Sequence, residues 1–215
     1  MKINKIHNTG NVCEDHNIEV MTSVIFERHL EQGELIITDN ILQSSNMIEN
    51  IHCNLIYLDS RKDINTIKIF IDSFGGYMRA SVTAAELIMS LNKPVWTYAL
   101  GHVWSASIVL FASGDKRFAF PSSSFMLHDI SIGGSEDTRL FYTRFALLND
   151  DLINKCTELL ALKTRTSKKQ WDEYYKSSGQ FFSTEDALDM GLVTDIIYPS
   201  KKKIDKHARN KKYNK

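Results

Sequence analysis

The sequence predicts one α/β domain with flexible ends. Two observations carry this prediction: strand-like and helix-like segments alternate along the chain, and two of the strand-like segments run into glycine turns that precede helices. Such alternation is typical of βαβ units, whose strands form a mostly parallel sheet. Hydrophobic residues make up 43% of the 215 residues, and a chain of this length buries a core without needing disulfides.

The first half of the chain contains three strand patterns and three helix patterns in alternation. A polar arm of residues 1–22 precedes them and is interpreted as flexible, and the domain itself is expected over residues 23–199. Apolar spacing predicts a strand at 34–38, a helix at 45–58, a strand at 67–72, a helix at 77–91, a strand at 95–100 and a buried helix at 103–112.

The second half begins with two short strands and ends in a lysine-rich tail. The predicted elements are strands at 116–120 and 124–128, a long helix at 136–163, a short helix at 183–190 and a last strand at 192–197. A long helix with an apolar stripe usually projects from a domain or packs on a partner. The short helix has Ser183 as its cap, Asp186 three residues later and Gly191 after its end. We expect the tail, residues 200–215, to be disordered, with binding to nucleic acid or to an acidic surface as the alternative.

Composition and charge exclude several classes of protein. The 26 basic and 26 acidic side chains give a formal net charge of zero, which argues against a nucleic-acid binder. No apolar run approaches the ~18 residues that cross a bilayer, and residues 1–25 lack the pattern of a signal peptide. The cysteines are too scattered for a disulfide framework or a zinc site, and the histidines lack ligand spacing. We therefore expect a cytoplasmic protein without a metal site.

Ser105 is the candidate nucleophile, in the segment GHVWSAS at residues 101–107. The segment lies between a strand and a buried helix, where free amide groups and the helix dipole favour negative charge. A nucleophile whose attack creates an oxyanion suits that place. Ser107 is a second candidate, and both serines are alternatively small residues that permit tight helix packing.

His128 and a pair of glycines complete the candidate site. His128 ends the strand FMLH, and a neutral imidazole is the base that a serine hydroxyl needs near pH 7. Gly75 and Gly76 follow the strand at 67–72, and adjacent glycines let backbone amides approach a ligand closely. The alternatives are a structural histidine and a plain tight turn. Because no nucleotide-binding glycine pattern is present, no nucleotide cofactor is expected.

Taken together and in this order, the motifs resemble those of the Clp protease proteolytic subunit family, ClpP, with its phage and plastid members. The matching residues run from the turn at 72–76 to a final phenylalanine-serine helix start and glycine-leucine-valine end at 181–193. Between them lie the nucleophile segment at 101–106 and a run that comprises Gly114, Lys116, Arg117, Pro121 and Met126 to His128. The resemblance implies a ClpP/crotonase-type fold of repeated β-β-α units with a long projecting helix.

The resemblance also implies a serine endopeptidase that acts through an acyl-enzyme. Ser105 would be the nucleophile, His128 the general base, and amides near Gly75, Gly76 and Ala106 the oxyanion and substrate-binding site. The substrate, an unfolded polypeptide, would lie as an extended strand. The family assembles as stacked heptameric rings that receive chains from an AAA+ Clp unfoldase. No cofactor is implied for the subunit itself, because ATP is used only by the unfoldase.

The third member of the triad departs from the family pattern. Counting back from Phe181 places Tyr174 or Tyr175 where the family has aspartate, and the nearest carboxylates are Asp172 and Glu173. We assign Asp172 to the role. Loss of such a carboxylate lowers turnover by about 10⁴.

This departure motivates one alternative, a catalytically impaired structural or regulatory ring subunit that keeps the fold while the triad has decayed. A second alternative comes from the fold that the family shares with crotonases. It is an enzyme that acts on acyl thioesters, in which the glycine amides hold a thioester oxyanion. Fold-level analogy does not separate them.

Overall fold

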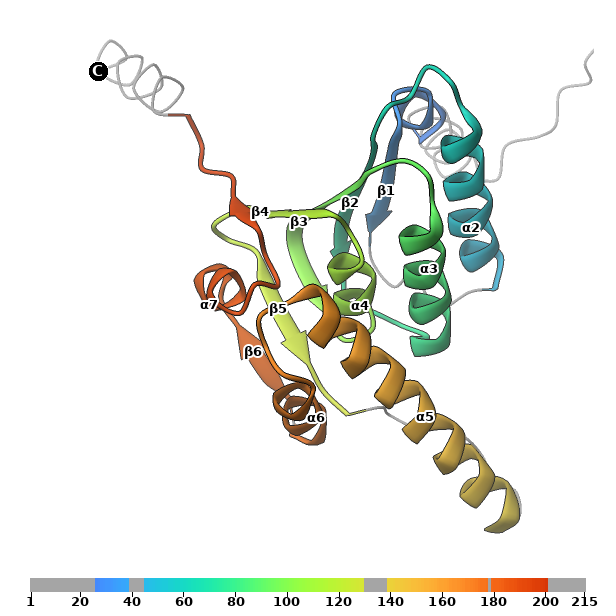
Figure 1. Cartoon of the computed structure of the whole chain (residues 1–215), viewed down its shortest axis with the longest axis vertical. Coiled ribbons are helices and arrows are strands. Elements are labelled where there is room, and N and C mark those ends of the chain that lie inside the picture. The colour runs from blue at the N-terminus through green and yellow to red at the C-terminus, as the bar shows by residue number, and fades with distance from the viewer. Residues whose placement is uncertain (1–25, 39–44, 130–138, 178, 201–215) are drawn as a thin grey trace, which may run out of the picture.

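A seven-stranded sheet organises the chain in the computed structural model, which describes residues 26–38, 45–129, 139–177 and 179–200 (Figure 1). The strands are β1 (Glu34–Thr38), β2 (Ile67–Ser73), β3 (Val95–Trp104), β4 (Lys116–Ala119), β5 (Ser124–Leu127), β6 (Gln180–Phe182) and β7 (Asp195–Ile196). Their order is β1-β2-β3-β4-β7, with β5 paired to β3 and β6 paired to β5. All pairs are parallel except β5 with β6, as expected for an α/β protein.

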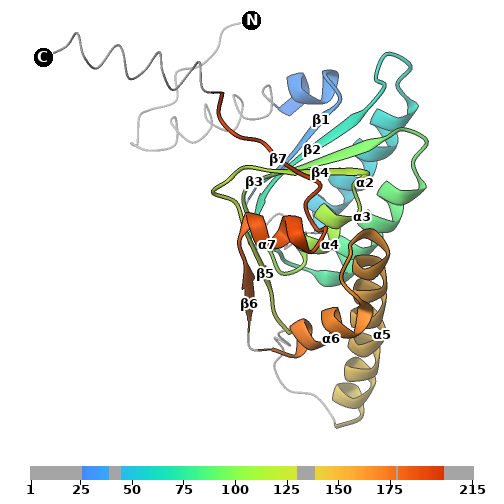
Figure 2. The same cartoon turned by 60° about the vertical axis from the view of Figure 1, so that its left-hand side comes forward.

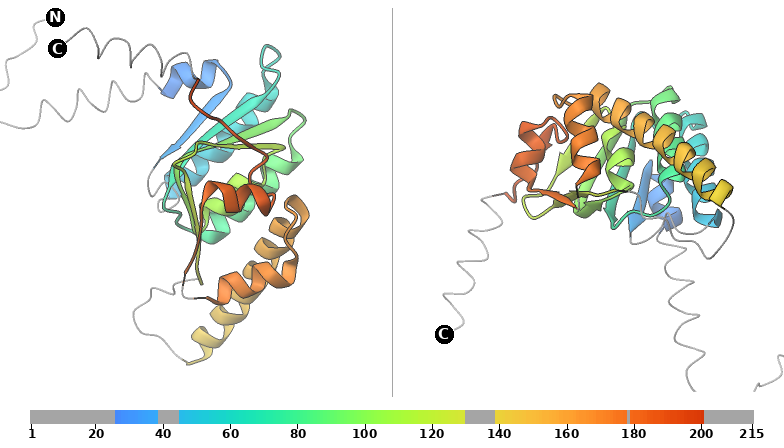
Figure 3. Two further views of the ribbon diagram at one scale, coloured as in Figure 1. Left: turned by 90° about the vertical axis from the view of Figure 1, so that its left-hand side faces the viewer. Right: turned by 90° about the horizontal axis from the view of Figure 1, so that it is seen from below.

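Helices cover one face of the sheet, with the apolar core between the two layers (Figure 2). They are α2 (Ser45–Ser60), α3 (Met78–Ser90), α4 (Ser107–Ala112), α5 (Arg139–Lys163), α6 (Lys168–Lys176) and α7 (Thr184–Asp189). Buried and half-buried residues alternate along β2, so its isoleucines and Ser73 lie on the buried face, and Lys68, Phe70 and Asp72 lie on the other. The α5 helix packs on α3, α4 and α6, and its N-terminal part extends beyond the sheet (Figure 3).

The predicted elements are present with one main correction, which concerns β3. The strand was expected to end before Gly101, but it continues to Trp104 because its last residues pair with β5, His102 opposite Ser124 and Trp104 opposite Met126. The following helix therefore begins at Ser107, four residues later than expected. The short helix is confirmed with its capping box, in which Ser183 and Asp186 satisfy each other's backbone amides.

Two elements were not anticipated, α6 and β6. Only Trp171 and Tyr175 of α6 are buried, so its apolar periodicity is weak in the sequence. The strand β6 is only three residues long and exists through its antiparallel pairing with β5. The expected arm at 1–22 and tail at 201–215 lie outside the described residues.

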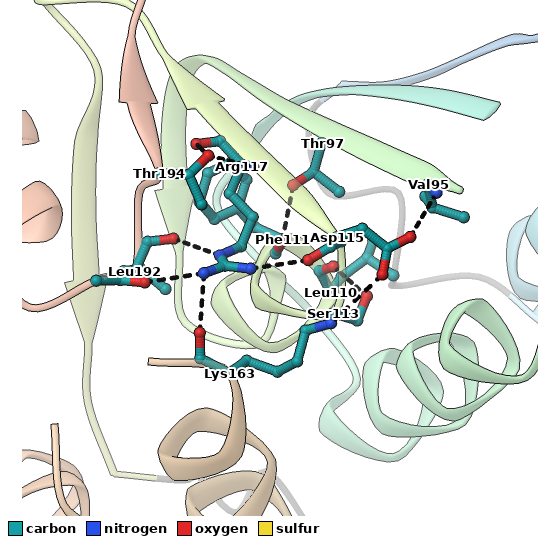
Figure 4. A network of polar contacts seen from close by, with 12 residues as sticks. Val95, Thr97, Leu110, Phe111, Ser113, Asp115, Arg117, Lys163, Leu192 and Thr194 are labelled. Carbon is teal, nitrogen blue, oxygen red and sulfur yellow. Dashed lines mark hydrogen bonds and ion pairs between the residues drawn. The ribbon is translucent and has the colours of Figure 1, made fainter. Parts of the chain in front are cut away.

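A buried arginine, Arg117, joins the ends of several elements (Figure 4). Its Nε donates to the carbonyl of Leu192 at 2.9 Å, and its terminal nitrogens donate to Gly114 at 2.9 Å, Lys163 at 2.8 Å and Gly191 at 3.0 Å. These carbonyls come from the turn after α4, the end of α5 and the turn after α7. Burial lowers the pKa of the Arg117 guanidinium. The four carbonyl oxygens accept its hydrogen bonds and fix its position.

None of the helices in the described part of the chain combines the length and the apolar character that a membrane span requires.

Candidate active site

Ser105 and His128 lie at the carboxyl ends of two neighbouring parallel strands. Trp104, the last residue of β3, pairs with Met126 of β5, and the amide of Ser105 donates to the Met126 carbonyl at 2.6 Å. His128 directly follows the last residue of β5. The carboxyl ends of parallel strands gather the working groups of an α/β sheet at one edge. The fold therefore brings the predicted nucleophile and the predicted base to the same edge.

Ser105 has a backbone conformation that L-residues rarely adopt. Its φ of 54° is positive, and within the described ranges no other non-glycine residue has a positive φ. Such a conformation costs on the order of 1–3 kcal/mol and concentrates at functional sites, where the surrounding structure enforces it. Here the enforcing contacts are the bond to Met126 and the bond from the Ile108 amide to the Ser105 carbonyl, 3.1 Å long. We call residues 104–106 the nucleophile turn.

The glycine turn, residues 73–76, touches the nucleophile turn directly. Gly75 and Gly76 have φ values of 99° and 148°. A Cβ atom added to Gly75 would lie 2.7 Å from the Trp104 carbonyl oxygen, 2.8 Å from the Ser105 Cβ and 3.0 Å from the Ala106 amide nitrogen. Only glycine fits between these atoms. The amide groups predicted to hold the oxyanion thus lie on two turns in van der Waals contact.

Ser107, the second candidate nucleophile, is fully buried and has a structural role. Its hydroxyl lies 2.7 Å from the Trp104 carbonyl and 3.1 Å from the Ser73 carbonyl, so it bridges the two turns. The packing interpretation therefore holds for Ser107. Ser105, by contrast, is partly exposed at the turn.

Replacement of Gly75 by alanine is expected to lower turnover on the order of 100-fold, because the added methyl group pushes the two turns apart and a misplacement of about 1 Å costs that much. Gly33→Ala is the matched control: Gly33 also has a positive φ, 78°, and its Cβ would meet Ile64 at 2.8 Å, but it precedes β1, far along the chain from both turns. Peptide hydrolysis per folded molecule, with thermal unfolding in parallel, checks this. Equal activity losses in the two variants would contradict it.

The residues at and near the third triad position, Asp172 to Tyr175, have other contacts, and Glu173 accepts from the Gln170 side-chain amide at 3.3 Å. Both carboxylate oxygens of Asp172 lie 3.1 Å from the Lys168 ammonium. Partial burial raises the pKa of Asp172, but hydrogen bonds from Thr157 and Lys168 outweigh it and leave the pKa below its ordinary value. The Tyr174 ring packs on Trp171, with ring centroids 5.6 Å apart.

Tyr175 is buried in the core between α3, α5 and α6. Its hydroxyl lies 3.9 Å from the Met78 sulfur and bonds to the Cys156 thiol. Burial raises the pKa of Tyr175 well above its usual value and that of Cys156 to about 12, so both side chains stay neutral. No hydrogen bond or ion pair joins the His128 ring to another residue of the described ranges, so the orienting role of Asp172 stays a prediction.

A pair that the sequence analysis did not identify lies beside both turns. Asp72 precedes the glycine turn and bonds to His102, which precedes the nucleophile turn. Each residue is three positions before Gly75 or Ser105, the only sequence signal that connects them. No group of histidine, cysteine, aspartate and glutamate side chains within the described part of the chain could hold a metal ion.

Comparison with known proteins identifies the family. A Clp protease family model matches residues 17–200. The ATP-dependent Clp protease proteolytic subunit 2 of Chlamydia trachomatis serovar D is 31% identical over 201 residues, covering 91% of this chain and 95% of its own length. The proteolytic subunit 1 of Chlamydia felis is 28% identical over 200 residues, with 91% and 95% covered. The resemblance and the fold class predicted from the sequence are confirmed, and the chain belongs to the Clp protease family.

Proposed function

We propose that this chain is the proteolytic subunit of a Clp-type serine protease, which cleaves unfolded polypeptides in the cytoplasm through an acyl-enzyme on Ser105. The observation that carries the proposal is the strained turn at Ser105, set against Gly75 and at the strand end beside His128. Neither alternative from the sequence is favoured by the family match.

The proposed reaction has two steps. The Ser105 Oγ attacks the scissile carbonyl while His128 accepts the hydroxyl proton, and amides near Gly75, Gly76 and Ala106 stabilise the oxyanion. The C–N bond then breaks, and the leaving amine takes the proton from His128. In the second step water attacks the ester, His128 again accepts and returns a proton, and free serine and a carboxylic acid result. No cofactor takes part.

The proposed substrate lies extended along the glycine turn. Main-chain bonds between an extended peptide and a strand edge supply affinity without reading side chains. A subunit that degrades unfolded chains of many sequences requires such binding.

The proposed assembly is a stack of homo-oligomeric rings, heptameric by resemblance, that receives chains from an AAA+ unfoldase. Two features support it. The N-terminal part of α5 extends beyond the sheet and could join two rings (Figure 1). The sheet face opposite the helices carries half-buried aromatic rings, with Phe70 stacked on Tyr98 at 4.7 Å and Tyr98 stacked on Phe118 at 4.9 Å. A contiguous aromatic face of this kind is typical of a surface that another protein covers.

Hydrolysis of a fluorogenic peptide by assembled protein tests the proposed roles of His128 and Asp172. We expect His128→Ala and Asp172→Asn each to lower turnover by about 10⁴, since one removes the base and the other its orienting carboxylate. For Asp172 this requires the carboxylate to leave Lys168. Glu173→Gln and Tyr175→Phe are the controls, and we expect both to retain turnover within about threefold.

The variants also separate the competing assignments. A His128→Ala variant as active as wild type would contradict the proposed base. Unchanged turnover in Asp172→Asn would contradict the assignment of Asp172 as the third member of the triad and leave a dyad of Ser105 and His128.

A further inference from the structure

The pairing of β2 with β3 is irregular at Asp72. Ile71 pairs with Ala99, but Ser73 pairs with Val103, so β3 has two more residues than β2 across this interval. The irregularity is a bulge, a device that re-aims the chain next to a site. The excess residues lie immediately before the nucleophile turn.

The Asp72 carboxylate bonds to the bulge, with 44% of its side chain exposed. Its Oδ1 accepts from the His102 amide at 2.7 Å, and the same oxygen lies 3.1 Å from the His102 Nδ1. A Cβ on Gly101 would lie 2.7 Å from that oxygen, so the carboxylate rests against the Gly101 backbone. One carboxylate therefore holds both the main chain and the ring of the bulge.

Aromatic rings enclose the His102 imidazole from both turns. Phe74 of the glycine turn lies 4.6 Å from the imidazole between ring centroids, and Trp104 of the nucleophile turn lies 4.8 Å from it at an interplanar angle of 87°. Phe74 and Trp104 also touch each other at 5.2 Å. The contacts thus join two segments of the chain: Asp72 and Phe74 belong to the segment of the glycine turn, and His102 and Trp104 to the segment of the nucleophile turn.

We propose that Asp72 and His102 form a strut that sets the position of Ser105 relative to the Gly75–Gly76 amides. This inference rests on the proposed function, and Asp72 is a positioning residue, because it acts through His102 and not on the reacting atoms. The buried Ser107 hydroxyl joins the two turns from the core side, and the strut joins them from the exposed side. The distance between nucleophile and oxyanion amides is then fixed from both sides.

Turnover of a fluorogenic peptide tests the strut. We expect Asp72→Ala to lower kcat roughly 10- to 100-fold, with KM changed less than about threefold, because the nucleophile shifts while the substrate edge remains. Asp72→Asn should restore kcat to within about threefold of wild type, since its amide oxygen still accepts from the His102 amide. Glu34→Ala is the matched control: Glu34 also bonds to a histidine, His29 at 2.8 Å, but on β1, and its loss should leave kcat unchanged.

A second measurement keeps the strut separate from the proposed reaction. Hydrogen exchange read by mass spectrometry should show residues 100–107 exchanging about tenfold faster in Asp72→Ala than in wild type or Asp72→Asn. Equal exchange in all three proteins overturns the strut even if none of them hydrolyses peptide. Faster exchange without any wild-type hydrolysis supports the strut and instead contradicts the proposed function. If Asp72→Asn turns over peptide as slowly as Asp72→Ala does, the proposed role of Asp72 as hydrogen-bond acceptor for the His102 amide is also overturned.

Discussion

Replacement of Ser105 by alanine is expected to abolish peptide hydrolysis, lowering turnover by a factor on the order of 10⁴ to 10⁶. The hydroxyl oxygen is the atom that forms the acyl-enzyme, and the two serines closest to it in the turns, Ser73 and Ser107, are fully buried. Ser107 is buried and bridges two carbonyls, so its hydroxyl has no access to a substrate. The residual rate reflects only substrate binding and the oxyanion amides.

The fold should survive this replacement. Alanine meets the same strain at the positive φ of residue 105 as serine does, and the enforcing bonds of the turn are made by the backbone. Ser113→Ala is the matched control, because Ser113 is a buried serine at the other end of α4 whose hydroxyl bonds to the Leu110 carbonyl at 2.7 Å. Initial rates and thermal unfolding of both variants check the prediction. Hydrolysis by Ser105→Ala at the wild-type rate would contradict it.

Replacement of Arg117 by methionine is expected to have the largest effect on stability, lowering the free energy of unfolding by about 3–5 kcal/mol. Methionine keeps the apolar stem of the side chain but leaves four carbonyls without their donor. Three of these carbonyls lie at the end of α5 (Lys163) and in the turn after α7 (Gly191 and Leu192). Loss of their donor therefore weakens the attachment of the C-terminal third of the chain to the sheet. Denaturant unfolding measures the change.

An exposed arginine provides the comparison. Arg61 bonds to Asp63 and Tyr57 at the surface, and Arg61→Met should cost less than about 1 kcal/mol, because water replaces the lost contacts. Arg117→Lys should fall between the two, since one ammonium reaches fewer carbonyls than a guanidinium fork. A loss in Arg117→Met no greater than that in Arg61→Met would show that water satisfies the four carbonyls.

The elements that were predicted well have strong local signals. The strand β1 matches its predicted bounds, and the capping box of α7 is readable from Ser183 and Asp186 alone. The end of β3 was not predictable in this way, because Gly101 is a normal strand terminator. Its last residues pair with β5, and the His102 amide bonds to Asp72, which lies thirty positions before His102. Tertiary contacts of this kind override local propensity.

The candidate site likewise contains residues with a local sequence signal and residues whose position depends on packing. Ser105, His128 and the glycine pair each follow a segment that was predicted as a strand, so each could be named as a candidate from the sequence. That they lie at one end of the sheet follows from the parallel pairing of β3 with β2 and β5. The third triad member was assigned by counting positions, which says nothing about where a side chain points. Tyr175 is in the core and Asp172 is bonded to Lys168, facts that only packing reveals. The Asp72–His102 pair was not predicted, because in these two segments the sequence analysis gave roles only to Gly75, Gly76 and Ser105.

The role of Ser105 as nucleophile is tested most directly by covalent labelling with a fluorophosphonate, with the modified residue located by mass spectrometry. We expect one adduct per subunit, on Ser105, and none in Ser105→Ala. Labelling should also stop after unfolding in denaturant, because the reactivity of Ser105 depends on the nucleophile turn and on His128. An adduct on a different serine of the assembled wild-type protein, or no adduct at all, would show that Ser105 is not the nucleophile.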